Sequence, residues 1–353
     1  MRITPRLNAG VARRYYSEEK LEDDKQFDIW GNLDIPFGRP ITWEDSRFLF
    51  KGIHPDTKKQ LTRIMNGKRR SGADLTFVAP KTVSILWGLA NDNDRAIIEE
   101  IHRDAVKDGL NLLSEKAVYA KRYKGELTYH GGFLFHHGMT RSRDPHLHTH
   151  AYLLNIGFVD SINSWRALDV DVRWSYAARD VYMLSLSWGL ASFGVEISSS
   201  GRYFEVELTK SLSDIFSKGK ELFIKHNLTD ESWKHFKKKK DLSLDFKRLR
   251  TRWISQAISV GFPIDSIKLV RTSISPVPIN TSTILSAGGK FSNAGKIWSA
   301  TIKLGGLGKT NIKEIRSASE ELTNKIFDKN GRNILKNDNQ NLNKDRSNER
   351  IIS

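Results

Sequence analysis

The chain contains no cysteine among its 353 residues. Disulfide bonds, thiolate zinc sites and thiol nucleophiles are therefore excluded. It also lacks any run of eighteen apolar residues, so we expect no membrane-spanning helix and no membrane partner. The first twenty residues are charged and have no apolar stretch of the kind found in secretory signals. These absences predict a cytoplasmic protein.

Positive charge is in clear excess, because 57 Lys and Arg residues stand against 41 Asp and Glu residues, a net charge of +16. This excess favours a polyanionic partner, with DNA or RNA ahead of an anionic membrane surface. Lys247 and Arg250 lie in a basic segment with helical spacing and are candidate phosphate contacts. The alternative for them is an ordinary solvated charged face.

The composition changes near residue 270. We expect residues 1–270 to form the folded domain, and residues 271–353 to form a flexible, poorly ordered polar and basic tail in which Ser, Thr, Asn, Gly and Lys dominate. Gly308, Lys309 and Thr310 resemble the end of a phosphate loop. Lys303 stands where that loop requires its first glycine, so no nucleotide site is expected.

Hydrophobic periodicity and turn residues predict a mixture of strands and helices. The expected strands cover residues 75–78, 127–135, 147–157 and 203–208. The expected helices cover residues 7–24, 80–89, 94–115, 176–193 and a segment that begins after Ser243 and ends before Gly261. Residues 91–93 are predicted to form a turn, and residues 138–145 the loop between the second and third strands.

Six of the ten histidines lie between His130 and His150. Side chains alternate along a strand, so His148 and His150 share one face of the third expected strand. His137 lies at the end of the preceding strand, and a hairpin would bring it alongside them. Three imidazoles with open positions can hold a catalytic metal. A structural zinc site with His146 as fourth ligand is the alternative, and His130 and His136 are interpreted as ordinary strand histidines.

Tyr15 and Tyr16 follow two arginines in the first expected helix. A tyrosine pair in a helix commonly packs in a core, but a tyrosine hydroxyl can also attack a phosphodiester. Adjacent helical residues point about 100° apart, so only one of the two can face the metal. Asp74 is an acid in an otherwise apolar strand. It would cap a turn, orient a ligand histidine or accept the tyrosine proton.

Three more basic residues are candidates for contacts with DNA. Lys81 lies at the start of an expected helix, where phosphates bind well. Arg141 and Arg143 lie in the loop that joins the two histidine-bearing strands.

Four sequence blocks occur in a fixed order. They are A-R-R-Y-Y around Tyr15, D-L-T-F-V-A-P-K-T-V-S at 74–84, F-H-H-G-M-T-R-S-R-D-P-H-L-H-T-H-A-Y-L-L-N at 135–155 and W-R-A-L-D at 165–169. With them the chain resembles the MobF-type conjugative relaxases of the HUH endonuclease group. The resemblance spans about residues 5–265.

The resemblance implies an α+β fold, with a central antiparallel sheet flanked by helices and the histidines on the sheet. It implies that His137, His148 and His150 bind the metal, that Asp74 is the neighbouring acid, and that Tyr15 is the nucleophile. The favoured metal is Mg²⁺ or Mn²⁺, with Zn²⁺ as an alternative. The implied activity is strand-specific nicking of single-stranded plasmid DNA through a 5′-phosphotyrosine intermediate, for conjugative mobilisation.

The implied setting is the bacterial cytoplasm, with single-stranded and hairpin DNA of a transfer origin as substrate. Accessory DNA-binding proteins, a helicase supplied in trans and a secretion coupling protein are the expected partners. Many relatives carry a second tyrosine pair, and residues 21–27 contain none. A rolling-circle replication initiator and a DNA-binding relative that has lost catalysis are the alternatives. A metallohydrolase acting on small molecules is disfavoured by the positive charge.

Overall fold

The computed structural model describes residues 2–6, 28–63, 70–120, 129–140, 142–200, 203–208, 210–216 and 246–272. The expected helix at 7–24, Ser243 and nearly all of the expected tail lie outside these residues. The domain boundary at 270 therefore stays a prediction. No helix in the described ranges is both long and apolar enough to cross a membrane.

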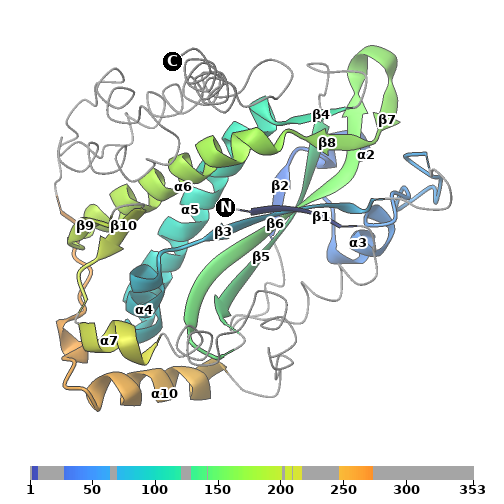
Figure 1. Ribbon diagram of the computed structural model, residues 1–353. Coiled ribbons are helices and arrows are strands. Elements are labelled where there is room, and N and C mark those ends of the chain that lie inside the picture. The colour runs from blue at the N-terminus through green and yellow to red at the C-terminus, as the bar shows by residue number, and fades with distance from the viewer. Residues whose placement is uncertain are drawn as a thin grey trace, which may run out of the picture.

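An antiparallel sheet lies at the centre of the molecule (Figure 1). The strand order is β1-β3-β6-β5-β2, and β7 pairs with the end of β6. The strands are β1 (Arg2–Arg6), β2 (Asp28–Gly31), β3 (Gly72–Val78), β5 (Tyr129–Met139), β6 (Pro145–Val159) and β7 (Ser164–Arg166). The long β5–β6 hairpin and β3 make up the middle of the sheet.

Helices cover the sheet from both sides (Figure 1). One side carries α4 (Lys81–Leu89), α5 (Asp92–Lys116) and α6 (Ser175–Ala191), and the other carries α2 (Asp34–Phe37) and α3 (Trp43–Leu49). The expected antiparallel α+β architecture is confirmed. The predicted turn at 91–93 is wrong, because the side chain of Asn91 accepts a hydrogen bond from the Asp94 amide and so caps a helix that begins at Asp92.

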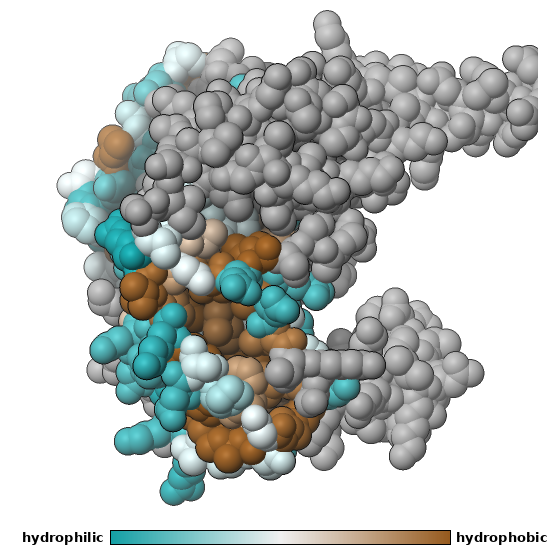
Figure 2. Space-filling model, turned by 90° about the vertical axis from the view of Figure 1, so that its left-hand side faces the viewer, coloured by the Kyte–Doolittle hydropathy of each residue, from teal (hydrophilic) through white to brown (hydrophobic). Residues whose placement is uncertain are grey.

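The remaining elements lie around this centre. They are β4 (Val118–Ala120), which pairs with β8 (Leu168–Val170), β9 (Ile197–Ser200), which pairs with β10 (Tyr203–Val206), α7 (Lys210–Ile215), α10 (Phe246–Ile258) and the 3-10 turns η1 (Asp160–Ile162), η2 (Val172–Trp174) and η3 (Ile264–Ser266). Phe246 and Trp253 of α10 pack against Trp87 of α4. The side of the molecule with β9, β10, α7 and α10 shows hydrophobic residues at its middle, bordered by hydrophilic ones (Figure 2).

Alternating residues of β6 enter two different cores. Leu147, Ala151 and Leu153 join the larger core formed with α4, α5 and α6. Tyr152 and Leu154 join the smaller core on the α3 side. The middle of β6 is thus buried on both faces, so the polar side chains from residue 148 to residue 155 are enclosed by protein.

The β5–β6 hairpin is longer than predicted, since β5 continues to Met139 instead of ending at residue 135. Its tight connection requires a left-handed residue, Arg143, with φ of 64°. The amide of Arg143 donates to the Thr140 carbonyl at 3.0 Å, and the indole N–H of Trp253 donates to the Arg143 carbonyl at 2.8 Å. Helix α10 therefore holds the tip of the hairpin, next to the strand ends that carry the histidines.

A candidate metal centre on the β5–β6 hairpin

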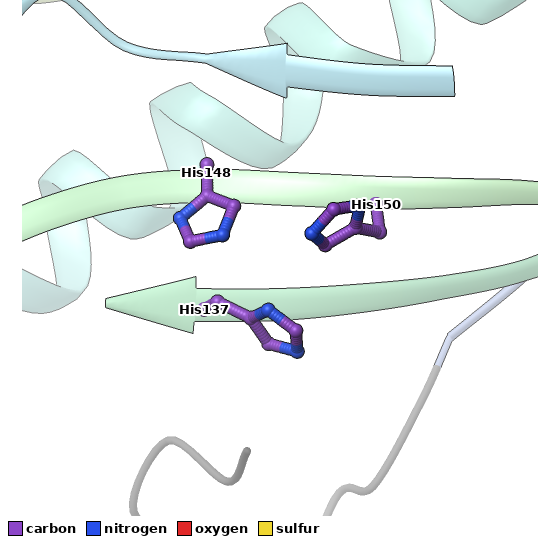
Figure 3. A group of neighbouring side chains, drawn as sticks. All are labelled: His137, His148 and His150. Atoms are coloured by element: carbon purple, nitrogen blue, oxygen red, sulfur yellow. The ribbon is translucent and has the colours of Figure 1, made fainter. Parts of the chain in front are cut away.

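Three histidines converge on the α3 side of the hairpin (Figure 3). His137 of β5 is the cross-strand partner of His148 of β6, and His150 lies two residues further along β6. One nitrogen from each ring lies within 4.8 Å of one from each of the others. The ring centroids are 5.1, 5.1 and 5.2 Å apart. The expected convergence of the three imidazoles is confirmed.

The imidazoles continue a row of aromatic side chains along the same face. The cross-strand pairs of the hairpin run from Phe133 with Tyr152, through Phe135 with His150, to His137 with His148. His137 is 1% exposed, and His148 and His150 are 8% and 7% exposed. The site is therefore backed by an apolar core and enclosed by protein, where electrostatic interactions are strong.

Hydrogen bonds orient two of the rings. The Nδ1–H of His150 donates to Oδ1 of Asp74 at 2.9 Å, and the hydroxyl of Thr76 donates to the same oxygen at 3.2 Å. The Nδ1–H of His148 donates to the carbonyl of His146 at 2.7 Å. A histidine held through Nδ1 presents Nε2 as the metal ligand. This arrangement is the one expected of a metal site with a supporting carboxylate, and it favours the orienting role for Asp74.

The charge state of His148 also fits a metal ligand. Burial, with a smaller contribution from the neighbouring imidazoles, holds its pKa well below 6.5. The ring is therefore neutral at pH 7, which is the form that binds a cation. Three imidazoles at mutual contact distance make a donor set that fits one divalent transition ion.

Lys81 lies at the first residue of α4 and reaches the start of β6. Its Nζ donates to the carbonyl of Pro145 at 2.9 Å. Burial lowers its pKa to about 8, and Asp144 offsets part of that effect. The lysine therefore keeps a charge at pH 7 beside the same strand that carries His148 and His150.

Comparisons with known proteins agree with this geometry. The family model for the TrwC relaxases matches residues 6–258, which is well over half of the chain. The chain belongs to the TrwC relaxase family. The expected membership in the MobF-type relaxases is confirmed.

Two similar proteins illustrate the family. The Escherichia coli multifunctional conjugation protein TraI is 34% identical over 130 residues, and the match covers 35% of this chain and 7% of that protein. A metal-bound structure of the conjugative relaxase TrwC in complex with oriT DNA is 26% identical. The match covers 74% of this chain and 99% of that one, with a TM-score of 0.64.

A second TrwC structure holds a 27-mer DNA comprising the recognition hairpin and the cleavage site. It is 24% identical over 74% of this chain and 99% of that one, and its TM-score of 0.62 shows the shared fold.

Several expected site residues of this family member lie outside the described part of the chain. They are Tyr15, Tyr16 and Arg141. Their roles stay predictions. Arg143 lies at the tip of the hairpin, in the turn that Trp253 holds.

Helix α10 shows two different environments for its expected DNA contacts. Lys247 lies on the exposed face of the helix. Arg250 instead donates to Asp92 and to the carbonyl of Ala90, both at 2.5 Å. These bonds tie α10 to the end of α4 and the start of α5, a role that the charge pattern alone did not indicate.

The other histidines of the cluster differ from the three that converge. His146 contacts the ring of His148 at 4.6 Å between centroids and is not part of the group within 4.8 Å. Burial lowers the pKa of His130 to about 4, and its ring meets Trp30 edge-on. His136 is hydrogen-bonded to Thr149 and Asp28 on the opposite face of the sheet. The sequence analysis did not predict these hydrogen bonds. The signal that could have indicated them is a pair of polar residues, His136 and Thr149, at inward-facing positions of two strands.

Proposed function

We propose that this chain nicks and rejoins single-stranded DNA at a plasmid transfer origin. The observation that carries the proposal is the buried set of His137, His148 and His150, with Asp74 bonded to the third, in a member of the TrwC relaxase family. The net charge of +16 supports a nucleic-acid substrate. The oriT DNA held by the similar TrwC structures supports a hairpin and a cleavage site as its parts.

The three histidines would hold a divalent cation through one nitrogen each. When bound, such a cation supplies positive charge against the non-bridging oxygens of the scissile phosphate. Imidazole donors favour transition ions over Mg²⁺ and bind Zn²⁺ more tightly than Mn²⁺. Mn²⁺ is nevertheless the ion to test first, because it also suits the oxygen ligands that a phosphate would add, with Zn²⁺ next. Asp74 keeps His150 in the tautomer that binds metal. The buried aromatic residues beside the site, Phe133, Phe135 and Tyr152, exclude water from that side.

Tyr15 is the proposed nucleophile. Its hydroxyl gives up its proton as the oxygen attacks the phosphorus, and the bond from phosphorus to the 3′ oxygen breaks. The 3′ oxygen leaves and takes up a proton, so no proton is gained or lost overall. The product is a 5′-phosphotyrosine and a free 3′ hydroxyl. The reverse attack by a 3′ hydroxyl rejoins the strand without ATP, because the phosphodiester energy is kept in the protein–DNA bond.

A denaturing gel tests the proposal. The protein is incubated with a labelled single-stranded oligonucleotide from a candidate origin and Mn²⁺, and a covalent adduct is expected. Tyr15→Phe should abolish the adduct, and Tyr16→Phe should leave most of it. An adduct that survives Tyr15→Phe and is lost in Tyr16→Phe moves the nucleophile to Tyr16. Tight binding of the oligonucleotide with no adduct in any form would instead identify a relative that has lost catalysis.

A further inference from the structure

Thr149 lies on β6 between two metal-binding histidines, and its side chain points to the opposite face of the sheet. It is fully buried. Its Oγ1 is 2.8 Å from Nδ1 of His136 and 2.8 Å from Nε2 of His102. His136 and Thr149 are cross-strand partners. The bond between them therefore joins β5 and β6 at the pair next to His137 and His148.

Two further side chains extend these bonds. Nε2 of His136 lies 3.1 Å from Oδ2 of Asp28 on β2, and Nδ1 of His102 lies 3.0 Å from the hydroxyl of Tyr182 on α6. The resulting chain of five side chains, here called the Thr149 network, links β2, β5, β6, α5 and α6. Its members are Asp28, His136, Thr149, His102 and Tyr182.

The hydrogens of the Thr149 network have a consistent direction. The carboxylate of Asp28 accepts from Nε2 of His136, and Nδ1 of that ring can accept from the Thr149 hydroxyl. The Thr149 oxygen then accepts from Nε2 of His102, whose Nδ1 accepts from the Tyr182 hydroxyl. Each ring nitrogen therefore has a hydrogen-bond partner. Burial lowers the pKa of His102 well below 6.5 and raises the pKa of Tyr182 well above 10, so both groups are neutral, as these bonds require.

Packing alone does not require this network. The residues beside it on the same face are Leu134, Leu147 and Ala151, all buried in the larger core. Apolar residues at the three fully buried positions, Thr149, His102 and Tyr182, would fill the space without desolvating polar groups. A buried polar network that is fully satisfied instead selects one arrangement of the elements that carry it. Here those elements are the two strands that present the three metal-binding histidines.

We infer that Thr149 and His102 are positioning residues for the metal centre. By fixing β5 and β6 to each other and to α5, they hold His137, His148 and His150 at the spacing that one ion requires. The inference rests on the proposed function, because it concerns the same metal centre. It assigns part of the metal affinity to residues that lie on the far face of the sheet and touch no ligand atom.

The test compares Mn²⁺ affinity with thermal stability in the full chain. Thr149→Val keeps the shape of the side chain and removes both hydrogen bonds. We expect its Mn²⁺ affinity at 20 °C, measured by titration calorimetry, to fall by on the order of tenfold. Thr149→Ser restores the hydroxyl and should return the affinity to within about threefold of the unmodified chain. Tyr182→Phe removes the last hydroxyl of the network and should cause a smaller loss.

Ser187→Ala is the matched control. Ser187 is also fully buried, and its hydroxyl donates to the Leu184 carbonyl within α6, so it is not part of the Thr149 network. It should lower the Tm and leave Mn²⁺ affinity unchanged. A Thr149→Val variant with a lower Tm and unaltered Mn²⁺ affinity would overturn the inference and leave the proposed function standing.

Two further outcomes are also decisive. If Thr149→Val does not fold, Tyr182→Phe decides, and an unchanged affinity there contradicts the inference. Absence of Mn²⁺ and Zn²⁺ binding in the unmodified chain would overturn the metal centre itself, and with it both proposals.

Discussion

The two faces of the β5–β6 hairpin carry histidines in adjacent positions with opposite surroundings. On the α3 face, His148 and His150 are each held through Nδ1, and one ring nitrogen each from His137, His148 and His150 lies within 4.8 Å of the other two. On the α5 face, both nitrogens of His136 and of His102 are used by hydrogen bonds to protein. The comparison teaches that burial alone does not distinguish a ligand from a structural histidine. The two kinds of histidine are distinguished by whether both ring nitrogens bond to protein or one is left to face the other imidazoles.

The largest expected effect comes from removing a ligand on the α3 face. His150→Ala should reduce Mn²⁺ affinity by about 100-fold or more, since it deletes one of three donors and the bond to Asp74. His146→Ala is the matched control on the same strand and face, and its effect should stay below about threefold. Titration calorimetry measures both. Equal large losses in the two variants would make His146 a fourth ligand, and an unchanged affinity in His150→Ala would show that the three histidines bind no metal.

A change behind the ligand should have a smaller effect. Asp74→Asn keeps the size of the side chain and weakens its ability to accept from Nδ1 of His150. We expect Mn²⁺ affinity to fall by roughly 10-fold to 100-fold, as when other carboxylate supports of metal-binding histidines are lost. The same titration measures it. An affinity equal to that of the unmodified chain would assign Asp74 to the α3 face as a packing residue only.

The sequence predicted the three metal-binding histidines on the α3 face but not the Thr149 network on the α5 face, for a physical reason. Strand alternation places His148 and His150 together from their spacing alone, because every second residue shares a face. His102 is 47 residues from Thr149 and lies on a helix whose packing partner no local pattern specifies. Strand and turn residues predicted the separate strands at 75–78, 127–135 and 147–157, and the family resemblance predicted their antiparallel sheet. Strand β2 and the extended end of β5 depend on pairing across the sheet.

The same lesson applies to the basic residues. Lys81 and Lys247 were predicted as DNA contacts from their charge and their positions in helices. Both lie within the described residues, and their contacts with DNA stay predictions. Arg250 forms a hydrogen bond with Asp92, which lies 158 residues earlier in the chain, and the sequence of α10 alone does not predict it. The tyrosine pair was predicted from the residues themselves, and the resemblance singled out Tyr15 as the nucleophile. Both tyrosines lie outside the described residues, so their place relative to the three metal-binding histidines stays a prediction.

The pH dependence of DNA binding should show whether the charge of Lys81 contributes to it. Burial lowers its pKa to about 8, below the ordinary 10.5, so its ammonium group is charged at pH 7 and mostly neutral at pH 9. Lys81→Arg keeps a charge at both pH values. We expect single-stranded DNA affinity to fall by about threefold more between pH 7 and pH 9 in the unmodified chain than in this variant. Fluorescence anisotropy measures it.

Lys81→Met supplies the reference, since it has no charge at either pH. Its affinity should match that of the unmodified chain at pH 9 and fall below it at pH 7. Identical pH profiles for the lysine and arginine forms would remove Lys81 from the DNA interface.

The smallest expected effect separates the two candidate contacts on α10. Lys247→Ala should reduce the slope of log affinity against log salt by about 0.7, the value for one contact to single-stranded DNA, and leave the Tm unchanged. Arg250→Ala should lower the Tm, because it removes the hydrogen bonds that join α10 to Asp92 and to the Ala90 carbonyl, and change the salt slope little. The reverse pattern would exchange their roles.

The central claim is that the α3 face of the hairpin binds a cation that DNA cleavage requires. The most direct test measures the covalent protein–DNA adduct with Mn²⁺ and with EDTA, in the unmodified chain and in His150→Ala. The account predicts an adduct in the unmodified chain with Mn²⁺, none with EDTA, and little or none in His150→Ala at the same Mn²⁺ concentration. An adduct of equal yield in EDTA, or in His150→Ala, would contradict it.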